Sequence, residues 1–260
     1  MTVPLDISSF LSASPQSQCL GQMALGFDRR ISIWRNQNDQ MCYRNPVGHA
    51  FGFYRCGGSG TRRMDGVVKR GWAGAVCVLP EGMDSDWDIT EQFEFLHLYL
   101  SDQELRHSFA ETFDCDSRLM VLSDQAYFEA PQLVPAFMAL HQATLSSSSL
   151  QAEEAVSELL HGLFTNGVGV SHKRHQVSGG LAPHQLRRIH DYVLADLSQQ
   201  IQLRDLAALV GFSEFHLQRS FRRSQGLSPH QWVLRKRLEL AQQLIRQGVP
   251  LAQVAVACGF

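Results

Sequence analysis

Residues 203–240 decide the fold of the C-terminal part of the chain, with the sequence LRDLAALVGFSEFHLQRSFRRSQGLSPHQWVLRKRLEL. The first apolar residues recur at the spacing of one helical face, and Gly211 follows where a left-handed glycine ends a helix. Ser213 is placed to cap a second helix, because its hydroxyl accepts from a free backbone N–H in the first turn. Gly226 ends that helix and Ser228 begins a third. The sequence therefore predicts three consecutive helices joined by short turns.

Two helices joined by a short glycine-containing turn are typical of the DNA-binding helix-turn-helix, whose second helix lies in the major groove. The polar side chains of the second helix suit that role. Arginine is a bidentate donor to guanine and glutamine pairs with adenine, which favours Arg219 and Gln218 as base contacts. The alternative from the pattern alone is an ordinary three-helix bundle whose basic face is only solvated.

The run LxxLAxxVGFSxxHLQRSFRRxxGLSPxQW, the helix RKRLELAQQLI and the segment PLAQVAVACGF together resemble the DNA-binding domain of the AraC/XylS family of bacterial transcription regulators. The resemblance spans residues 181–260 and implies two helix-turn-helix units joined by a long helix. Carried over by position, the groove-facing residues are Glu214, Phe215, Gln218, Arg219 and Arg222. Phosphate contacts are expected from Arg222, Arg223 and the basic run from Arg235 to Arg237. The expected core residues are Leu206, Ala207, Leu217, Phe221, Trp232, Leu238 and Ala241.

The second unit stops at Gly259-Phe260, after a first helix whose inner face is Val254, Ala255 and Cys258. A family member is expected to continue for about 30 more residues, by the usual lengths of such helices. The sequence thus predicts an incomplete second unit, weaker DNA affinity and a frayed C-terminus. A regulator that acts by dimerisation only, without binding DNA well, is an alternative.

Charge divides the chain into two parts. Residues 1–172 hold 11 Lys and Arg against 20 Asp and Glu, whereas residues 173–260 hold 12 against 5, so the net charges are −9 and +7. A basic part joined to an acidic one fits a nucleic-acid-binding domain linked to a domain that avoids the polyanion. With 44% hydrophobic residues the chain has the composition of a folded globular protein.

The N-terminal part has the texture of β-structure after an irregular entry segment at residues 1–20. Short apolar runs occupy residues 24–27, 31–34, 50–54, 75–79 and 93–100, separated by Gly and Pro turns. This spacing predicts a small closed barrel or jelly roll. The resemblance implies a cupin-like barrel here, so the expected fold class is α+β, with a cupin-like domain over residues 1–165.

Such a barrel can enclose a small-molecule effector. The aromatic residues that are candidates to line it, each of them more commonly plain core, are Trp34, Phe53, Tyr54, Trp72, Trp87, Phe95 and His97. The glycine-rich run at residues 57–63 is expected to be a mobile loop with two solvated arginines rather than an anion cradle. The acidic run at residues 84–88 is expected to be a solvated turn.

Helical patterns follow the barrel at residues 103–113, 130–145 and 150–164, with a short strand at 118–122. The last two helices form a hairpin, which in the family carries the dimer contact; the alternative is that they cap the open end of the barrel. Residues 166–180 are a Gly/Ser-rich linker with a basic patch at 172–175. A helix beginning at Pro183 opens the DNA-binding domain of residues 181–260.

No enzymatic motif accompanies this fold. His49, His97 and His107 stand apart, the six cysteines have no zinc spacing, and no nucleotide-binding signature occurs. We therefore expect no catalytic residues, metal or cofactor, although a cupin-type enzyme is the alternative class. We see no signal peptide or membrane span, so we expect a cytoplasmic protein. The expected partners are double-stranded promoter DNA, a small-molecule effector and a second copy through residues 130–164, with RNA polymerase as a further candidate and no membrane.

Overall fold

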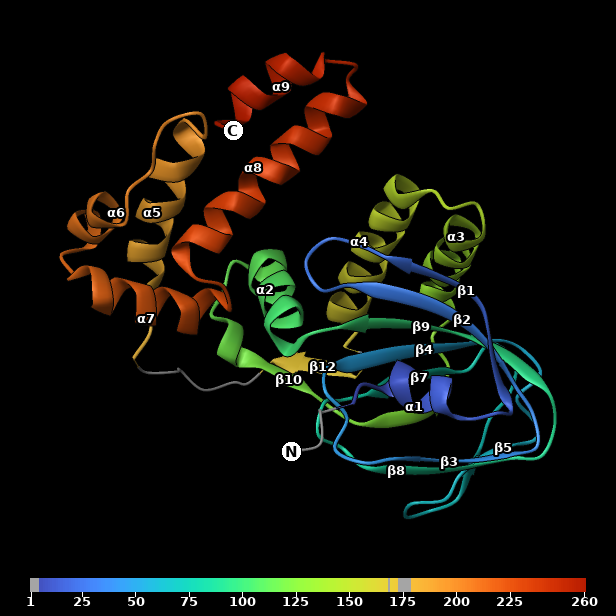
Figure 1. Ribbon diagram of the computed structural model, residues 1–260. Helices are drawn as coiled ribbons and strands as arrows, with labels where there is room; N and C mark the ends of the chain where they lie inside the picture. Colours follow the sequence, from blue (N-terminus) through green and yellow to red (C-terminus); the bar gives the residue numbers. More distant parts are fainter. Residues whose placement is uncertain (1–4, 168, 173–178) are drawn as a thin grey trace. The chain divides into compact units, whose positions relative to one another are not determined.

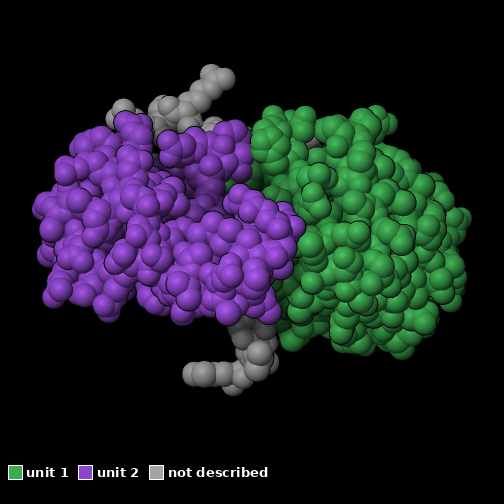
Figure 2. Space-filling view, turned by 90° about the horizontal axis from the view of Figure 1, so that it is seen from above, with its two compact units in different colours: residues 1–108, 120–172 green, residues 109–119, 173–260 purple. Residues whose placement is uncertain are grey.

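The computed structural model describes residues 5–167, 169–172 and 179–260 (Figure 1). The chain forms two compact units, shown in different colours in Figure 2. Unit 1 contains residues 1–108 and 120–172, and unit 2 contains residues 109–119 and 173–260. Residues 168 and 173–178 of the predicted linker, including the basic residues 173–175, lie outside the described residues.

Unit 1 is built on two antiparallel sheets. The six-stranded sheet has the order β1 (Ser17–Ala24), β2 (Arg30–Asn36), β9 (Phe93–Leu100), β4 (His49–Cys56), β7 (Val76–Leu79) and β11 (Gln125–Phe128). The four-stranded sheet has the order β3 (Asp39–Tyr43), β8 (Ser85–Ile89), β5 (Thr61–Arg63) and β6 (Lys69–Arg70). A separate pair joins β10 (Met120–Leu122) to β12 (Val170–His172). Two such sheets are the architecture of a cupin-type jelly roll, and the predicted α+β class is confirmed.

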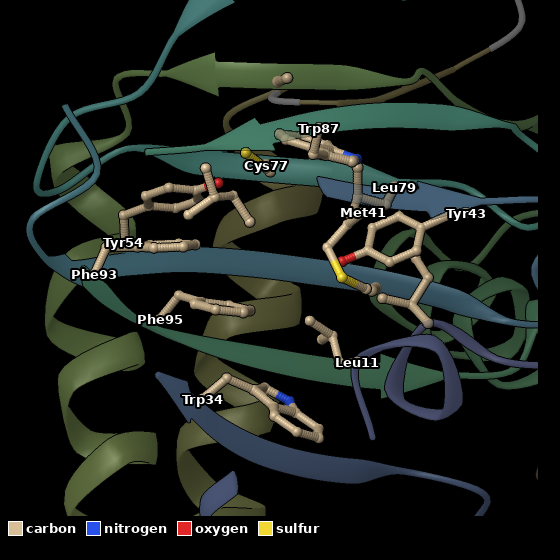
Figure 3. Packing of buried hydrophobic residues seen from close by; sticks show 14 of the residues in the cluster. Leu11, Trp34, Met41, Tyr43, Tyr54, Cys77, Leu79, Trp87, Phe93 and Phe95 are labelled. Carbon is tan, nitrogen blue, oxygen red and sulfur yellow. The ribbon is translucent and has the colours of Figure 1, made fainter. Parts of the chain in front are cut away.

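Both sheets contribute to one apolar core, because successive side chains of a strand point to opposite faces. Tyr54 of β4 stacks on Phe93 of β9 with ring centroids 4.9 Å apart, and Phe93 stacks on Phe95 at 4.7 Å. Tyr43 of β3 and Trp87 of β8 belong to the same buried cluster from the other sheet. Figure 3 shows these rings pointing toward one another from the two sides.

Three predictions for unit 1 are wrong. Residues 5–20 are not irregular, since Asp6 caps α1 (Ile7–Ala13) by accepting from the backbone N–H of Ser9 at 2.7 Å, and β1 follows. The acidic run 84–88 is strand β8 rather than a turn. Its alternation buries Ser85, Trp87 and Ile89, whereas Asp86 and Asp88 are half-buried on the other face.

The third concerns the arginines after the glycine-rich run. Arg62 forms an ion pair with Asp88 at 2.6 Å, and Arg63 forms ion pairs with Asp65 at 2.8 Å and Asp124 at 2.5 Å. The side chain of Arg63 is only 10% exposed. The two arginines therefore fasten the β5 region to its neighbours and are not solvated loop residues.

Helices flank the β-structure of unit 1, as the sequence predicts. They are α2 (Asp102–Phe113), which continues into unit 2, then α3 (Val134–Leu145) and α4 (Ser149–Thr165), with short 3₁₀ turns at Ser117–Leu119 and Pro131–Leu133. α3 and α4 pack side by side, and α3 contacts β1 and β2 (Figure 1). Phe53 of β4 stacks on Phe137 of α3 at 5.0 Å, so it lies on the face of the sheet opposite to Tyr54.

Unit 2 contains five further helices among its described residues. They are α5 (Pro183–Ala195), α6 (Leu203–Val210), α7 (Glu214–Gln225), α8 (Pro229–Arg246) and α9 (Leu251–Cys258). α9 ends at a left-handed Gly259, after which the backbone N–H of Phe260 donates to the carbonyl of Ala255 at 2.9 Å. The fraying expected at this end stays a prediction. Across the described ranges, no helix has the length and apolar character needed to cross a membrane.

Candidate nucleic-acid interface

The turn between α6 and α7 is fixed by its caps. Gly211 has φ 72° and ψ 29°, the left-handed conformation that ends a helix. The hydroxyl of Ser213 accepts from the backbone N–H of His216 at 3.2 Å and begins α7. The ring of Phe212 stacks on that of His216 at 4.1 Å, nearly parallel. The orientation of α7 relative to α6 therefore follows from these three local features of residues 211–216.

The inner face of α7 belongs to the core of unit 2. Leu217 and Phe221 are fully buried, and the Phe221 ring lies edge-on to that of Trp232 at 5.8 Å. His190 of α5 stacks on Trp232 at 4.4 Å. Burial lowers the pKa of His190, so the neutral ring is favoured in this core. Of the seven core residues predicted from the sequence, only Leu238 is half-buried rather than buried.

The outer face of α7 carries the predicted base-reading side chains. Glu214, Phe215, Gln218, Arg219 and Arg222 are all exposed, Phe215 to 76%. They follow the spacing of one helical stripe. Within the described parts of the chain, neither Arg219 nor Arg222 forms an ion pair, so both guanidinium groups are available to an anionic partner.

The basic residues of α8 are placed differently from those of α7. The side chain of Arg235 is 8% exposed and its Nε lies 3.2 Å from Glu239 Oε1. Arg237 donates to the backbone carbonyls of Leu197, Gln199 and Gly259 at 3.0, 2.8 and 2.9 Å. Both arginines thus use their N–H groups for hydrogen bonds inside the unit. The sequence predicts that they contact phosphates, but the structure does not place them for such contacts.

Comparison with known proteins agrees with this geometry. A family model described as "Helix-turn-helix domain" matches residues 206–260. The probable transcriptional regulator LumQ of Photobacterium leiognathi is 40% identical over 73 residues, 28% of this chain and 29% of LumQ. The C-terminal part of the chain therefore matches a helix-turn-helix domain and is similar to a curated transcriptional regulator.

Other known proteins resemble the chain at lower sequence identity. The HTH-type transcriptional regulator YbfI of Bacillus subtilis (strain 168) is 29% identical over 76 residues, 29% of this chain and 28% of YbfI. The solved AraC-like transcriptional activator CuxR is 14% identical with a TM-score of 0.43, covering 89% of this chain and 82% of CuxR. An apo ToxT variant of Vibrio cholerae is 12% identical with a TM-score of 0.44, and the match covers 92% of this chain and 90% of ToxT. The sequence matches span under a third of the two curated relatives.

The effector-lining candidates predicted from the sequence fall into three groups. Trp34, Tyr54, Trp87, Phe95 and His97 are buried between the sheets, Phe53 lies on the opposite face, and Trp72 is 37% exposed. The cavity that Tyr54, Trp87, Phe95 and His97 share has a volume of only about 20 Å³. That is room for about one water molecule.

His97 sits in this closed interior as a neutral ring. Its Nδ1 lies 3.1 Å from Tyr99 Oη, which accepts from Trp34 Nε1 at 3.0 Å. Burial lowers the pKa of His97 to about 3. No group of three or more His, Cys, Asp or Glu in the described residues is arranged to hold a metal ion.

Three residues in the segment 109–119 contact the helices of unit 2 and were not predicted from the sequence. They are Glu111, Asp116 and Ser117, which bond to residues in α7 and α8. Nothing in the sequence signals these contacts, because the partners are more than 100 residues apart.

Proposed function

We propose that this chain is a sequence-specific DNA-binding transcription regulator that inserts α7 into the major groove. The observation that carries the proposal is the exposed stripe on a helix capped at both ends and anchored by Leu217 and Phe221. A rigid helix with free Gln and Arg side chains is what direct readout of bases requires. Function at this level is supported by the helix-turn-helix match at residues 206–260.

The roles of the basic residues follow from their placement. Gln218 and Arg219 contact base edges, and Arg222 and Arg223 contact phosphates, which orient the helix without specifying sequence. Glu214 and Phe215 stand at the first turn, where they exclude mismatched bases or contact a thymine methyl group. Arg235 and Arg237 act in the fold of unit 2 instead, for the bonding reasons given above.

The proposed division of labour places effector sensing in residues 1–165 and DNA binding in 181–260, joined by residues 166–180. A ligand in the interior of unit 1 would meet an aromatic wall with several polar groups, among them Asn36 Oδ1. That oxygen is buried and has no hydrogen-bond partner within the described ranges. Because the cavity measures about 20 Å³, an effector enters only if core side chains move.

The helical hairpin is the proposed dimer contact. α3 and α4 leave three large apolar side chains in solvent, Met138, Leu145 and Leu150, each between 43% and 53% exposed. Exposed apolar residues on adjacent helices suit self-association, and a second copy would bring a second α7 to a neighbouring half-site.

The test is selection of DNA sites from a random library by the full chain, followed by binding measurements over a salt series. We expect enrichment of a defined site, a preference for it over random DNA, and affinity that falls steeply with salt. Arg219→Ala should reduce the preference for the selected site. Arg237→Ala is the matched control, because it also removes one arginine but from α8 rather than from the exposed face of α7. Absence of any enriched site would contradict the proposal.

A further inference from the structure

A short segment from the middle of the chain belongs to the DNA-binding unit. Residues Phe109–Leu119 lie in unit 2 together with residues 173–260, although the strands β9 and β10 that flank them in the sequence are in unit 1. The segment comprises the last turns of α2 and the 3₁₀ turn Ser117–Leu119. Its contacts with α7 and α8 concern the proposed reading helix directly.

The first contact is at the C-terminal end of α7. The last carbonyls of a helix have no partner within the helix. Here the carbonyl of Arg222 accepts from the backbone N–H of Gly226 at 2.9 Å, and the carbonyl of Arg223 accepts from the hydroxyl of Ser117 at 3.0 Å. Ser117 is 1% exposed, so this bond is shielded from water. A residue of the segment thus completes the cap of α7.

The second contact is a chain of hydrogen bonds through Ser224. The Ser224 hydroxyl accepts from the backbone N–H of Leu181 at 2.9 Å and donates to Asp116 Oδ2 at 3.0 Å. Asp116 is itself held by Arg118, whose Nε and Nη2 donate to it at 2.8 and 2.7 Å. A methyl group on Gly180 would lie 2.4 Å from Ser224 Oγ, which shows how closely the backbone passes.

The third contact is on α8. Lys236 forms ion pairs with Glu111 of the segment and with Glu239, and its Nζ lies 5.8 Å from the centre of the Trp232 ring. Burial disfavours the charge, but the two carboxylates outweigh it and raise the pKa of Lys236. Because Trp232 packs on Phe221, the segment also supports the inner side of α7.

These contacts are made by single polar side chains, so each of them can be removed by one substitution. A hollow of about 470 Å³ lies beside them, lined by residues that include Asp114, Cys115, Leu186 and Ser224. Phe109 and Ala110 of the segment are themselves buried, so apolar packing accompanies these polar contacts. At its other end, α2 is fixed in unit 1. His49 accepts from the backbone N–H of Glu81 through Nδ1, which leaves its Nε2–H to donate to Asp102 at 3.2 Å.

We propose that residues 109–119 are a positioning element for α7, and that α2 carries changes in unit 1 to that element. The inference rests on the proposed function for its consequence on DNA. It assigns Ser117, Asp116 and Glu111 to the positioning of the reading helix α7. None of the three belongs to α7 or to its proposed DNA-contacting face.

The experiment compares full-length Ser117→Ala and Glu111→Gln with Ser146→Ala. Ser146 is a matched control, because its hydroxyl donates to the carbonyl of Gln142 at 3.0 Å at the end of α3 in unit 1. Hydrogen exchange of the peptides covering residues 220–228 is measured without DNA. We expect exchange to rise about 2- to 10-fold in the first two variants and to be unchanged in the control, as loss of one hydrogen bond implies. Unchanged exchange in both Ser117→Ala and Glu111→Gln would overturn the positioning role.

The second measurement is binding to the selected DNA site and to random DNA. We expect the preference for the selected site to fall about 2- to 10-fold, while the salt dependence stays the same because no phosphate contact is removed. A variant that is merely less folded would lose affinity for both DNAs equally, and that result would also overturn the proposal. If the unaltered chain shows no preference, the proposed function fails, and the exchange result alone decides whether the segment holds α7.

The link through α2 has its own variant, Asp102→Ala, which removes the carboxylate that His49 contacts and that accepts from Arg106 Nε at 2.7 Å in unit 1. Increased exchange at residues 220–228 would support the link, although the substitution is in the other unit. Increased exchange confined to α2 itself, with α7 unchanged, would refute it.

Discussion

Acid should destabilise unit 1 through one histidine. His97 is buried at the centre of the six-stranded sheet, where its ring lies 4.8 Å from Phe95 and 5.5 Å from Tyr99. Its pKa is lowered from 6.5 to about 3 by burial. Since the unfolded chain binds this proton near pH 6.5 and the folded chain does not, the stability is present above pH 6.5. It is lost as the pH falls from 6.5 toward 3.

The expected loss is set by the difference between the two pKa values. At pH 5 the unfolded histidine is almost fully protonated, which costs the folded state about 2 kcal/mol relative to pH 7. The full difference of about 3.5 pKa units corresponds to roughly 5 kcal/mol at pH 3 or below. The range between pH 7 and 5 is the informative one, because most carboxylates remain ionised there.

The assay is urea unfolding at several pH values, followed by tryptophan fluorescence in a Trp232→Phe background. The remaining tryptophans, Trp34, Trp72 and Trp87, all lie in unit 1. His97→Phe removes the titrating group and should flatten the dependence of the unfolding free energy on pH by about 2 kcal/mol between pH 7 and 5. His161→Gln, an exposed histidine of α4, is the control. Parallel curves for the unaltered chain and His97→Phe would refute a buried neutral His97.

Three further predictions concern unit 2. Arg219→Ala should cost about 1–3 kcal/mol at the selected site and relax the preference there; equal weakening on random DNA would contradict base contact. Arg223→Ala should reduce the salt slope of DNA binding by about 1, whereas Arg237→Ala should lower the melting temperature and leave the slope unchanged. Ser213→Ala should destabilise unit 2 by about 1 kcal/mol in chemical denaturation, because the cap of α7 is lost; an unchanged midpoint would show that the cap contributes nothing.

The sequence predicts the DNA-binding helices well because their boundaries are set locally. Gly211, Ser213, Gly226 and Ser228 each fix a helix end through bonds within a few residues, and the apolar spacing fixes the buried face. In the structure, α6, α7 and α8 begin or end next to these predicted capping residues. Such local determinants do not depend on distant parts of the chain, so a single sequence suffices.

The short strands of unit 1 were not predictable in the same way. β8 alternates acidic with small or aromatic residues, and its strand character depends on pairing with β3 and β5 on either side. Charge at Asp86 and Asp88 suggested a turn, but each aspartate forms an ion pair with an arginine, Arg44 or Arg62, on a neighbouring element. Partners 26 or more residues away give no periodic signal in the sequence.

At the candidate site, too, contacts between residues distant in sequence could not be predicted. These contacts change which of the basic residues are available to DNA. Residues 173–260 carry a net +7, but residues 109–119 add three acidic residues and one arginine, so unit 2 carries +5. Within it, Arg235, Lys236 and Arg237 are engaged by carboxylates or backbone carbonyls, whereas Arg219 and Arg222 on α7 form no ion pair in the described chain. Net charge alone therefore overstates the surface available to phosphates. What favours DNA at α7 is the position of two guanidinium groups without ion pairs, Arg219 and Arg222, on one exposed stripe, where they contribute positive potential.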